Sequence, residues 1–326
     1  MGVRLLVVAV AALVAGCRAH THDFGIPVKP THVQLTPQRL EVLLRAEPLP
    51  VRAVRSATGG TSGAELAWLD FPSEGMVIRA KWKAAPHRGE RLNNVPRKEL
   101  AAYAIQKLFL APDEYVVPVT VARCLPTAFH DSRFGHARAF DDTRCVLGIV
   151  SDWIEDATND NLRDWRRFAR DPAYARTIAN LNLLTYVIDH RDTRKANFIL
   201  TKPGRPPRAY AVDNGLAFSG IRNPLAWFVP DWSHLLVPSV PRDTVARLRT
   251  LDRAALDRLA VVAQFRRSAD GGLEEIAPTA PTDERHGVRV TGDIVQLGLT
   301  RKEIDAIERR IRALLVRVDA GDLPLF

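Results

Sequence analysis

The sequence predicts an α+β protein whose strands are concentrated in the first half of the chain and whose helices dominate the second half. Two observations lead to this prediction. Short apolar segments such as Met76 to Lys83, which alternates in hydropathy, and Cys145 to Trp153 are typical of strands. Beyond residue 154, apolar residues recur at helical spacing instead, as in Ala173 to Val187. With 326 residues, the chain can form one large or two small domains.

The composition is that of an ordinary globular protein, with 46% hydrophobic and 25% charged residues. The formal net charge of +9 favours acidic partners such as nucleotide phosphates or anionic lipid headgroups. A basic, solvated surface without such partners would give the same balance. No run of lysines and arginines contains interleaved aromatic residues, so we do not expect a nucleic-acid partner.

The N-terminus has the pattern of a targeting segment. Arg4 precedes an apolar stretch from Leu5 to Val14 that is too short to span a membrane as a mature helix. The following Leu13-Val14-Ala15-Gly16-Cys17 resembles the lipobox of bacterial lipoproteins, in which the cysteine is lipidated. We therefore predict a signal peptide over residues 1–16 and a lipid-anchored protein of the cell envelope, facing the periplasm or the exterior. An ordinary secretory signal or a short anchor helix is the alternative.

Residues 17–50 are predicted to form a tether between the membrane and the folded part of the chain. The segment contains five prolines, which favour an extended backbone. A short helix is predicted within it, from Pro37 to Arg45.

Two cysteines, Cys124 and Cys145, remain after Cys17. An even pair in an oxidising compartment favours a disulfide bond. No residues at metal-ligand spacing surround them, and two buried thiols are the alternative. We predict the bridge.

The first residues with a chemical pattern form a glycine-rich loop between two strand-like segments. Glycine lets the backbone approach a phosphate group closely, and bare N–H groups with hydroxyls can cradle it. A plain turn has the same composition. The predicted loop consists of Gly59, Gly60, Thr61, Ser62 and Gly63.

The next pattern is a basic strand followed by a helix that carries a glutamate. Lys81 and Lys83 lie on the same face of the predicted strand, because strand side chains repeat every two residues. The helix follows Asn94, a plausible N-cap, and Pro96, which suits a first turn. Glu99 lies near its start. A basic exposed strand and a first-turn glutamate favoured by the helix dipole are the alternatives.

The most specific pattern lies in the second half of the chain. Asp171-Pro172 predicts the start of a helix that leads into His190-Arg191-Asp192, with Asn197 five residues after Asp192. A second apolar run ends at Asp213-Asn214-Gly215. One carboxylate can orient or deprotonate an attacking hydroxyl, while an amide oxygen and a second carboxylate can hold metal ions. A turn rich in Asp and Asn is the alternative.

The remaining chain is predicted to be mainly helical. A helix is expected over Val245 to Arg266, followed by a loop from Ser268 to Asp293. Thr300 and Glu303 form a capping box that predicts a final helix to about Val318.

The order of these motifs resembles the protein-kinase-like superfamily over roughly Val54 to Phe218. The D-N-G in place of D-F-G is similar to the secretory-pathway Golgi casein-kinase type and the type II phosphatidylinositol 4-kinases. This resemblance implies a two-lobed fold with a sheet-rich N-lobe over residues 51–153 and a helical C-lobe over residues 154–326, joined near Asp152 to Asp160. No A-P-E motif follows, so the pattern departs from ordinary protein kinases and leaves the acceptor open.

The resemblance also implies a role for each motif residue. I-R-A-K makes Lys81 the preferred phosphate-binding lysine, and W-K-A makes Lys83 the alternative. The implied roles are catalysis for Asp192, ligation of Mg²⁺ or Mn²⁺ for Asn197 and Asp213, pairing with the lysine for Glu99, and nucleotide binding for Gly59 to Gly63.

The sequence thus predicts an ATP- and divalent-metal-dependent phosphotransferase of the cell envelope. Its γ-phosphate acceptor would be a hydroxyl group on a protein, lipid or sugar. Transfer of the nucleotidyl group is the alternative chemistry for the same residues. The alternative from another class is a non-catalytic, kinase-like lipoprotein that binds a nucleotide or a partner.

Overall fold

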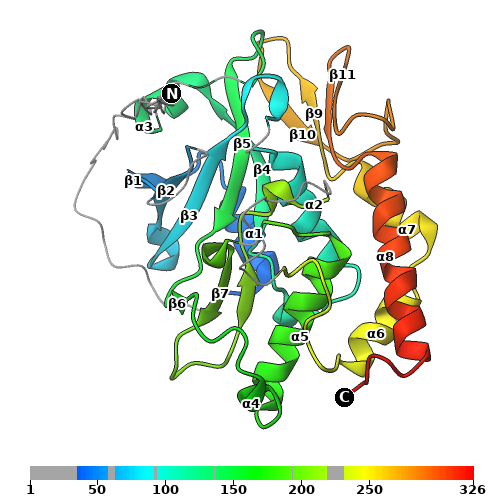
Figure 1. Ribbon diagram of the computed structural model, residues 1–326. Coiled ribbons are helices and arrows are strands. Elements are labelled where there is room, and N and C mark those ends of the chain that lie inside the picture. Colours follow the sequence, from blue (N-terminus) through cyan, green and yellow to red (C-terminus); the bar gives the residue numbers. More distant parts are fainter. Residues whose placement is uncertain are drawn as a thin grey trace, which may run out of the picture.

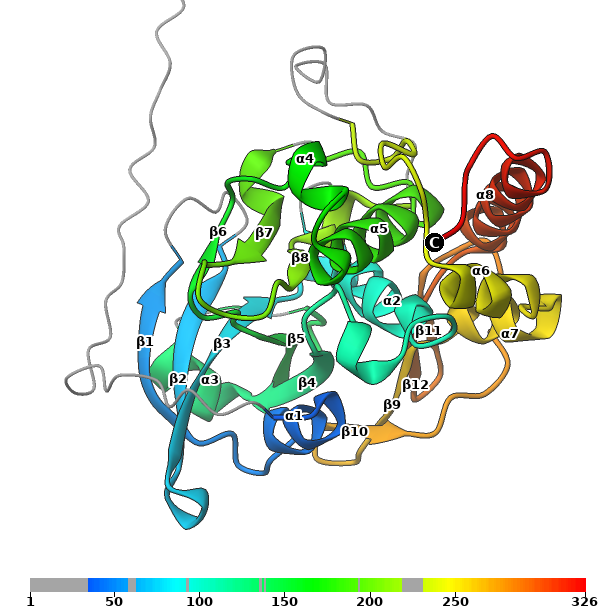
Figure 2. The ribbon, with the colours of Figure 1, turned by 90° about the horizontal axis from the view of Figure 1, so that it is seen from below.

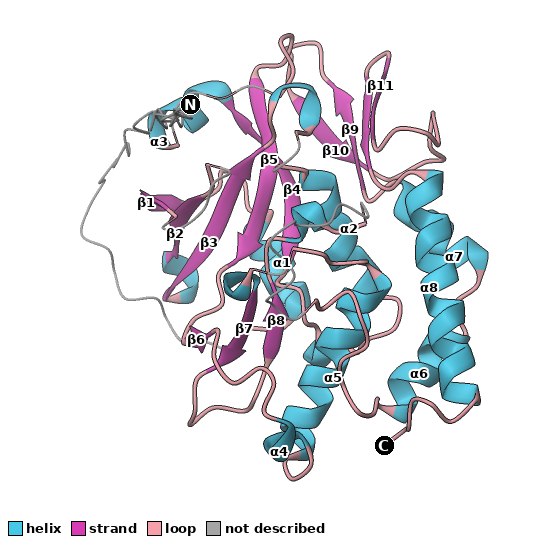
Figure 3. Ribbon diagram, in the orientation of Figure 1, coloured by secondary structure: helices cyan, strands magenta, loops and turns pink. Residues whose placement is uncertain are grey.

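The structure is a computed structural model that describes residues 35–57, 63–91, 94–134, 137, 139–192, 194–218 and 231–326. The chain folds into a mixed α+β protein, with antiparallel sheets in both halves (Figure 3). The predicted α+β class is therefore confirmed. None of the helices within the described ranges combines enough length with enough hydrophobicity to span a bilayer.

The largest sheet has five strands and forms the first half of the fold (Figure 1). Neighbouring strands are antiparallel throughout, in the order β1-β2-β3-β5-β4. The alternating hydropathy of the segment around Lys81 correctly predicted its central strand, β3. The five strands are β1 (Val51–Ser56), β2 (Glu65–Phe71), β3 (Met76–Ala84), β4 (Thr120–Pro126) and β5 (Cys145–Asp152).

Helices cover both faces of this sheet. Trp82 and Val150 belong to the same buried cluster as Leu44 of α1 (Pro37–Leu44). Ile149, which lies on the opposite face of β5 from Val150, packs in a second cluster with Leu100 of α2 (Pro96–Gln106). The two helices lie on either side of β4 in Figure 2. A third helix, α3 (Thr127–Arg133), follows β4 directly.

The end of the predicted tether is part of the folded body. The predicted helix is present as α1, capped by Thr36, whose side chain accepts a hydrogen bond from the Arg39 amide. Leu43 and Leu44 are almost fully buried, as is Leu49. Because burial of such side chains contributes about 1.5–3 kcal/mol each, this segment is held firmly against the sheet. The described structure thus packs from residue 37 onward, ahead of the predicted boundary at residue 51.

The segment that bears the chemical motifs begins with a long buried helix. As predicted, α5 (Pro172–Val187) starts after Asp171, whose carboxylate accepts a hydrogen bond from the Tyr174 amide. It is preceded by the short α4 (Trp165–Phe168). Three short strands flank the motifs in the order β6-β7-β8, namely β6 (Ala157–Thr158), β7 (Phe198–Thr201) and β8 (Ala209–Ala211).

The predicted helix over Val245 to Arg266 is wrong in its second half. Asp252 breaks it into α6 (Arg242–Arg249) and α7 (Arg253–Asp257), because its side chain caps a new helix by accepting from the Ala255 amide. The residues that follow form a strand. The predicted loop from Ser268 to Asp293 is also partly wrong, since it contributes two strands to a second sheet.

This second sheet has four antiparallel strands in the order β10-β9-β12-β11. Phe265 and Val295 on it pack with Leu100 of α2 and Ile149 of β5, so it joins the core of the first half. The predicted helical character of residues 154–326 is therefore incomplete. The strands are β9 (Ala263–Arg267), β10 (Leu273–Ile276), β11 (Val288–Thr291) and β12 (Ile294–Leu297).

The last helix, α8 (Arg301–Asp319), is predicted correctly from its capping box. The Thr300 hydroxyl accepts from the Glu303 amide, and the Glu303 carboxylate accepts from the Thr300 amide at 2.8 Å. One face of α8 buries a helical stripe of apolar residues: Ile304, Ile307, Ile311 and Leu314.

Candidate active site

A cavity of about 510 Å³ brings together residues from both halves of the chain. Its walls come from β3, α2, the end of β5 and the segments around Asn197 and Asp213. Ala57 and Ala64, which flank the predicted glycine loop, also line it. The described residues on either side of the predicted loop thus lie at the same cavity as Asn197 and Asp213.

Lys83 is a buried charge that contacts two residues of this cavity, Glu99 and Asp213, although the described lining of the cavity includes Lys81 rather than Lys83. Its side chain is 1% exposed, and its Nζ lies 3.1 Å from Glu99 Oε1 and 3.0 Å from Asp213 Oδ1. Burial by itself would lower the pKa of Lys83, but the two carboxylates outweigh it and raise the pKa above its usual value. Lys83 is therefore a fixed cation between two anions.

Glu99 connects three segments. It lies in the first turn of α2 and is almost fully buried. One carboxylate oxygen contacts Lys83, and the other accepts a hydrogen bond from the Asn214 amide at 3.2 Å. This side chain therefore ties α2 to β3 and to the turn that carries Asp213.

Asp213 lies in a left-handed backbone conformation, with φ 59° and ψ 58°. Such a conformation is uncommon for a residue other than glycine and persists only where the surroundings enforce it. Burial would raise the pKa of Asp213, but Lys83 and Lys81 lower it below its usual value. The turn thus presents an ionised carboxylate to the cavity.

The geometry distinguishes the two candidate lysines. Lys81 lines the cavity, but its Nζ is 3.7 Å from Glu99 Oε1 and its side chain is 16% exposed. Lys83, two residues on, makes the closer contacts with Glu99 and Asp213. The W-K-A pattern at Lys83 therefore describes the buried pair better than the I-R-A-K pattern at Lys81.

Asp192 is held by an arginine that the sequence patterns did not single out. The Arg194 guanidinium binds both carboxylate oxygens, with Nε 3.1 Å from Oδ1 and Nη2 2.8 Å from Oδ2. Burial raises the pKa of Asp192, but Arg194 lowers it further than burial raises it. Nη2 of Arg194 also lies 4.0 Å from Asp213 Oδ2. Arg194 therefore links the two motif carboxylates. Its position only two residues after Asp192 is the sequence feature that could have predicted this contact.

Asn197 is buried beside the cavity, and its backbone accepts a hydrogen bond from the Val212 amide at 2.8 Å. This bond joins the two motif segments. The side-chain Nδ2 is buried without a hydrogen-bond partner in the described part of the chain. Buried amides are normally satisfied, so this Nδ2 can still donate a hydrogen bond to a water molecule or a ligand.

His190 has a packing role. It is fully buried, its ring lies 5.1 Å from that of Phe198, and neither ring nitrogen has a hydrogen-bond partner among the described residues. Burial lowers its pKa, so the imidazole is neutral. The preceding Asp189 is left-handed, with φ 51°, and is bound by Arg191 and by Arg310 of α8.

The donor set fits a cation that arrives with a nucleotide. In the ranges that the structure describes, no three His, Cys, Asp or Glu side chains gather closely enough to hold a metal ion. Asn197 and Asp213 nevertheless line one cavity. Mg²⁺ needs only one or two carboxylates when phosphates and waters complete its coordination.

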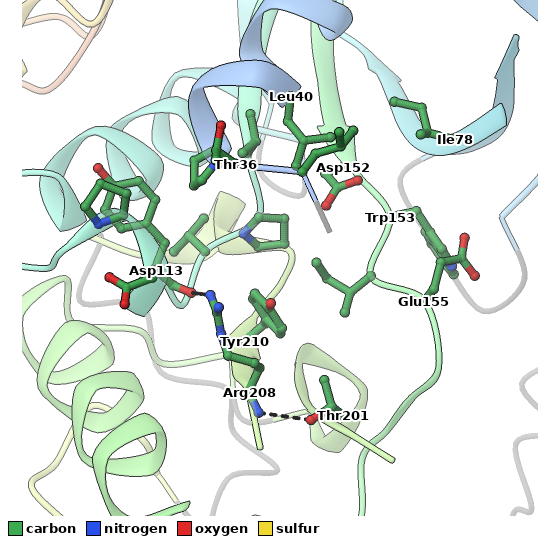
Figure 4. Close-up of a pocket in the computed structure, with 18 of the residues that line it drawn as sticks. Thr36, Leu40, Ile78, Asp113, Asp152, Trp153, Glu155, Thr201, Arg208 and Tyr210 are labelled. Atoms are coloured by element: carbon green, nitrogen blue, oxygen red, sulfur yellow. Dashed lines mark hydrogen bonds between the residues drawn. The ribbon is translucent and has the colours of Figure 1, made fainter. Parts of the chain in front are cut away.

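A second cavity, of about 780 Å³, adjoins the first along residues 152–155 (Figure 4). Its walls include Leu40 of α1 and the N-cap of that helix, Thr36, together with Arg208 and Tyr210. Burial and the neighbouring Glu155 raise the pKa of Asp152, which lines both cavities, to about 7. None of the motif residues that the structure describes borders this second cavity.

Some predicted residues lie outside the described ranges: Gly59, Gly60, Thr61, Ser62 and Cys17. The last loop residue, Gly63, has a φ of 69°, a left-handed conformation that favours glycine. The predicted disulfide is present. Cys124 of β4 and Cys145 of β5 are bonded, with their Cα atoms 5.4 Å apart.

No family model matches the chain, and a search of curated proteins finds no match.

Proposed function

We propose that this protein is a divalent-metal-dependent phosphotransferase that binds ATP and passes the γ-phosphate to a hydroxyl acceptor. The observation that carries the proposal is the contact of Lys83 with both Glu99 and Asp213, at 3.1 and 3.0 Å, beside a cavity also lined by Asn197. This arrangement gathers a lysine, two carboxylates and an amide from four separate segments. Removing these groups from water costs free energy, which binding of a ligand would offset. The kinase-like two-lobed arrangement belongs to the same proposal.

The residues divide the chemistry as follows. Lys83 and the loop before Ala64 hold the phosphates, and Glu99 keeps Lys83 in place. Asn197 and Asp213 would hold Mg²⁺ or Mn²⁺, which supplies positive charge to the transferring phosphoryl group. Asp192 orients the acceptor hydroxyl. Because Arg194 lowers the pKa of Asp192, orientation contributes more than proton abstraction.

A thermal-shift titration of the purified protein with Mn²⁺ and ATP tests binding. A ligand that binds only the native state stabilises it by about 2.7 kcal/mol at a hundredfold excess over Kd. Asp213→Ala should remove the metal-dependent part of this shift. Asp305→Ala is the matched control, since Asp305 pairs with Arg253 on the surface of α8. An unchanged shift in Asp213→Ala contradicts the metal assignment.

Transfer of the γ-phosphate tests catalysis. Asp192→Asn should bind Mn·ATP as the parent does, because Asn197, Asp213 and Lys83 remain. It should lose turnover on an envelope extract by about 10²-fold, the usual effect of misplacing a reacting group. Equal transfer by the parent and the variant contradicts the role of Asp192.

A non-catalytic binding protein is the second candidate, and the observation that favours it is Arg194. Its guanidinium occupies both oxygens of Asp192, which leaves that carboxylate less free to meet an acceptor. Tight Mn·ATP binding without γ-phosphate transfer would support this candidate. Label from the α-phosphate retained on protein would indicate nucleotidyl transfer instead. The cell-envelope location and the lipid anchor at Cys17 remain part of the proposal.

A further inference from the structure

The contact between Glu99 and Lys83 depends on the position of the first turn of α2. Glu99 lies in that turn, and its Oε1 reaches Lys83 Nζ at 3.1 Å. Lys83 itself is fixed in the middle of a five-stranded sheet. Whatever holds the first turn of α2 therefore decides whether the pair forms.

Arg97, two residues before Glu99, ties this turn to α8. Its Nη1 donates to Glu303 Oε2 at 2.8 Å and its Nη2 to Glu303 Oε1 at 3.3 Å. Nη1 also donates to the Gly298 carbonyl at 3.1 Å, and Nε donates to Glu90 at 2.5 Å. A guanidinium that donates to both oxygens of one carboxylate is held in a defined orientation, whereas a single hydrogen bond would leave it free to rotate.

The contact is protected from water. The Arg97 and Glu303 side chains are 8% and 11% exposed. Burial would raise the pKa of Glu303, but Arg97 lowers it below its usual value, so Glu303 is ionised. Lys98 adds a second cation, with its Nζ 3.6 Å from Glu303 Oε1. Removing one partner of a buried pair is costly, because the other charge is left without compensation.

The second sheet presses on the same turn. At Gly287, a Cβ atom would lie 2.2 Å from Arg97 Nε, so only glycine lets the chain pass this close to the guanidinium. Leu100 packs against Phe265 and Val295 of the sheet. In Figure 2, α2 lies beside β11 and β12. The C-terminal sheet and α8 thus form a rigid support for α2.

We infer that Glu303 is a positioning residue for the Lys83–Glu99 pair: through Arg97 and Lys98 it holds α2 in the position where Glu99 meets Lys83. The 206 positions between Arg97 and Glu303 mean that the C-terminal segment of the chain assembles this site. The role of the Lys83–Glu99 pair in a nucleotide site rests on the proposed function. The positioning of α2 by Glu303 does not depend on that function.

Glu303→Gln tests the inference without removing the helix cap. A glutamine can still accept from the Thr300 amide, as in an ordinary capping box, but it cannot form the ion pairs with Arg97 and Lys98. Glu308→Gln is the matched control. Glu308 lies on the same helix and pairs with Arg253 at 2.9 Å and with Arg312.

Two measurements on the ligand-free protein report on α2 directly. Lys83 is buried and protonated in the parent, so an amine-acylating reagent should label it slowly. In Glu303→Gln, labelling of Lys83 and amide exchange in α2 should rise at least about threefold, the lower range for coupled buried residues. Affinity for Mn·ATP should fall by a similar factor, while the control matches the parent in all three.

Unchanged labelling and exchange in Glu303→Gln overturn the inference, and so does an equal rise in the control. If Glu303→Gln does not fold, Gly287→Ala displaces Arg97 without changing any charge, and the same rise is expected. A parent protein that binds no nucleotide contradicts the proposed function, yet the labelling result still decides the positioning role.

Discussion

Lys83 illustrates how burial selects one of two equivalent residues. Both lysines face the same side of β3, so their spacing could not separate them. Lys83 contacts two carboxylates, whereas Lys81 lines the cavity and lies farther from Glu99. The difference arises from how α2 and the Asp213 turn pack on the strand.

Replacing each lysine by methionine should therefore have unequal effects. Lys83→Met leaves Glu99 and Asp213 without their cation, which should lower the free energy of unfolding by about 3–5 kcal/mol. It should also abolish Mn·ATP binding. Lys81→Met should cost less than about 1 kcal/mol, as for other partly exposed ion pairs. Urea unfolding and thermal-shift titration measure both, and equal losses would contradict the assignment to Lys83.

Asp152 should make stability depend on pH. Its pKa is raised from the usual value to about 7 by burial and by Glu155. Between about pH 4 and pH 7 the folded protein therefore holds a proton that the unfolded chain releases, so the contribution of Asp152 to stability falls as pH rises.

Asp152→Asn removes this titration. The variant should gain at least about 1 kcal/mol relative to the parent on going from pH 4 to pH 8. Urea unfolding of both proteins across this pH range provides the test. A difference between them that stays constant with pH would mean that Asp152 titrates normally.

At the scale of elements, strands β4 and β5 are joined by the Cys124–Cys145 bridge, 21 positions apart in the chain. β5 runs on from the bridge to Ser151 and Asp152 at the cavity wall. The bridge closes a loop that includes α3. It should therefore act mainly by reducing the conformational freedom of the unfolded chain, and less by changing the shape of the cavity.

Replacing both cysteines by serine should lower the free energy of unfolding by about 3 kcal/mol, the typical value for a loop of this length. Reducing agent should have the same effect on the parent and none on the double variant. Thermal unfolding with and without reductant checks this. A parent that is insensitive to full reduction would show that strand pairing alone carries the stability.

At the scale of the whole molecule, the chain ends contribute in different ways. α1 near the start packs on the first sheet, and α8 at the end supports α2 through Glu303. The proposed lipid anchor at Cys17 would attach the folded body to a membrane through the segment before residue 35.

The lipobox pattern makes that attachment testable. Cys17→Ser should block lipidation, so the variant should stay unprocessed and partition away from the membrane fraction. Mass spectrometry and fractionation of both proteins provide the measurement. If the two agree in mass and partitioning, Cys17 is not lipidated.

Local patterns in the sequence determined much of this protein. The capping residues Asp171 and Thr300 marked the starts of α5 and α8, and alternation marked β3, because these signals depend only on neighbouring residues. The motif residues Glu99, Asn197 and Asp213 were found by residue type and spacing. In the structure, all three line the same cavity.

Only the tertiary structure decided how distant segments meet. The strands β9 to β12 were missed, since their short polar segments pair across the chain and gain stability only when packed on α2 and β5. The choice of Lys83, the clamp of Arg194 on Asp192 and the support of Arg97 by Glu303 were likewise not readable from the chain. Each depends on burial and distance between residues, and those are properties of the folded molecule rather than of sequence spacing.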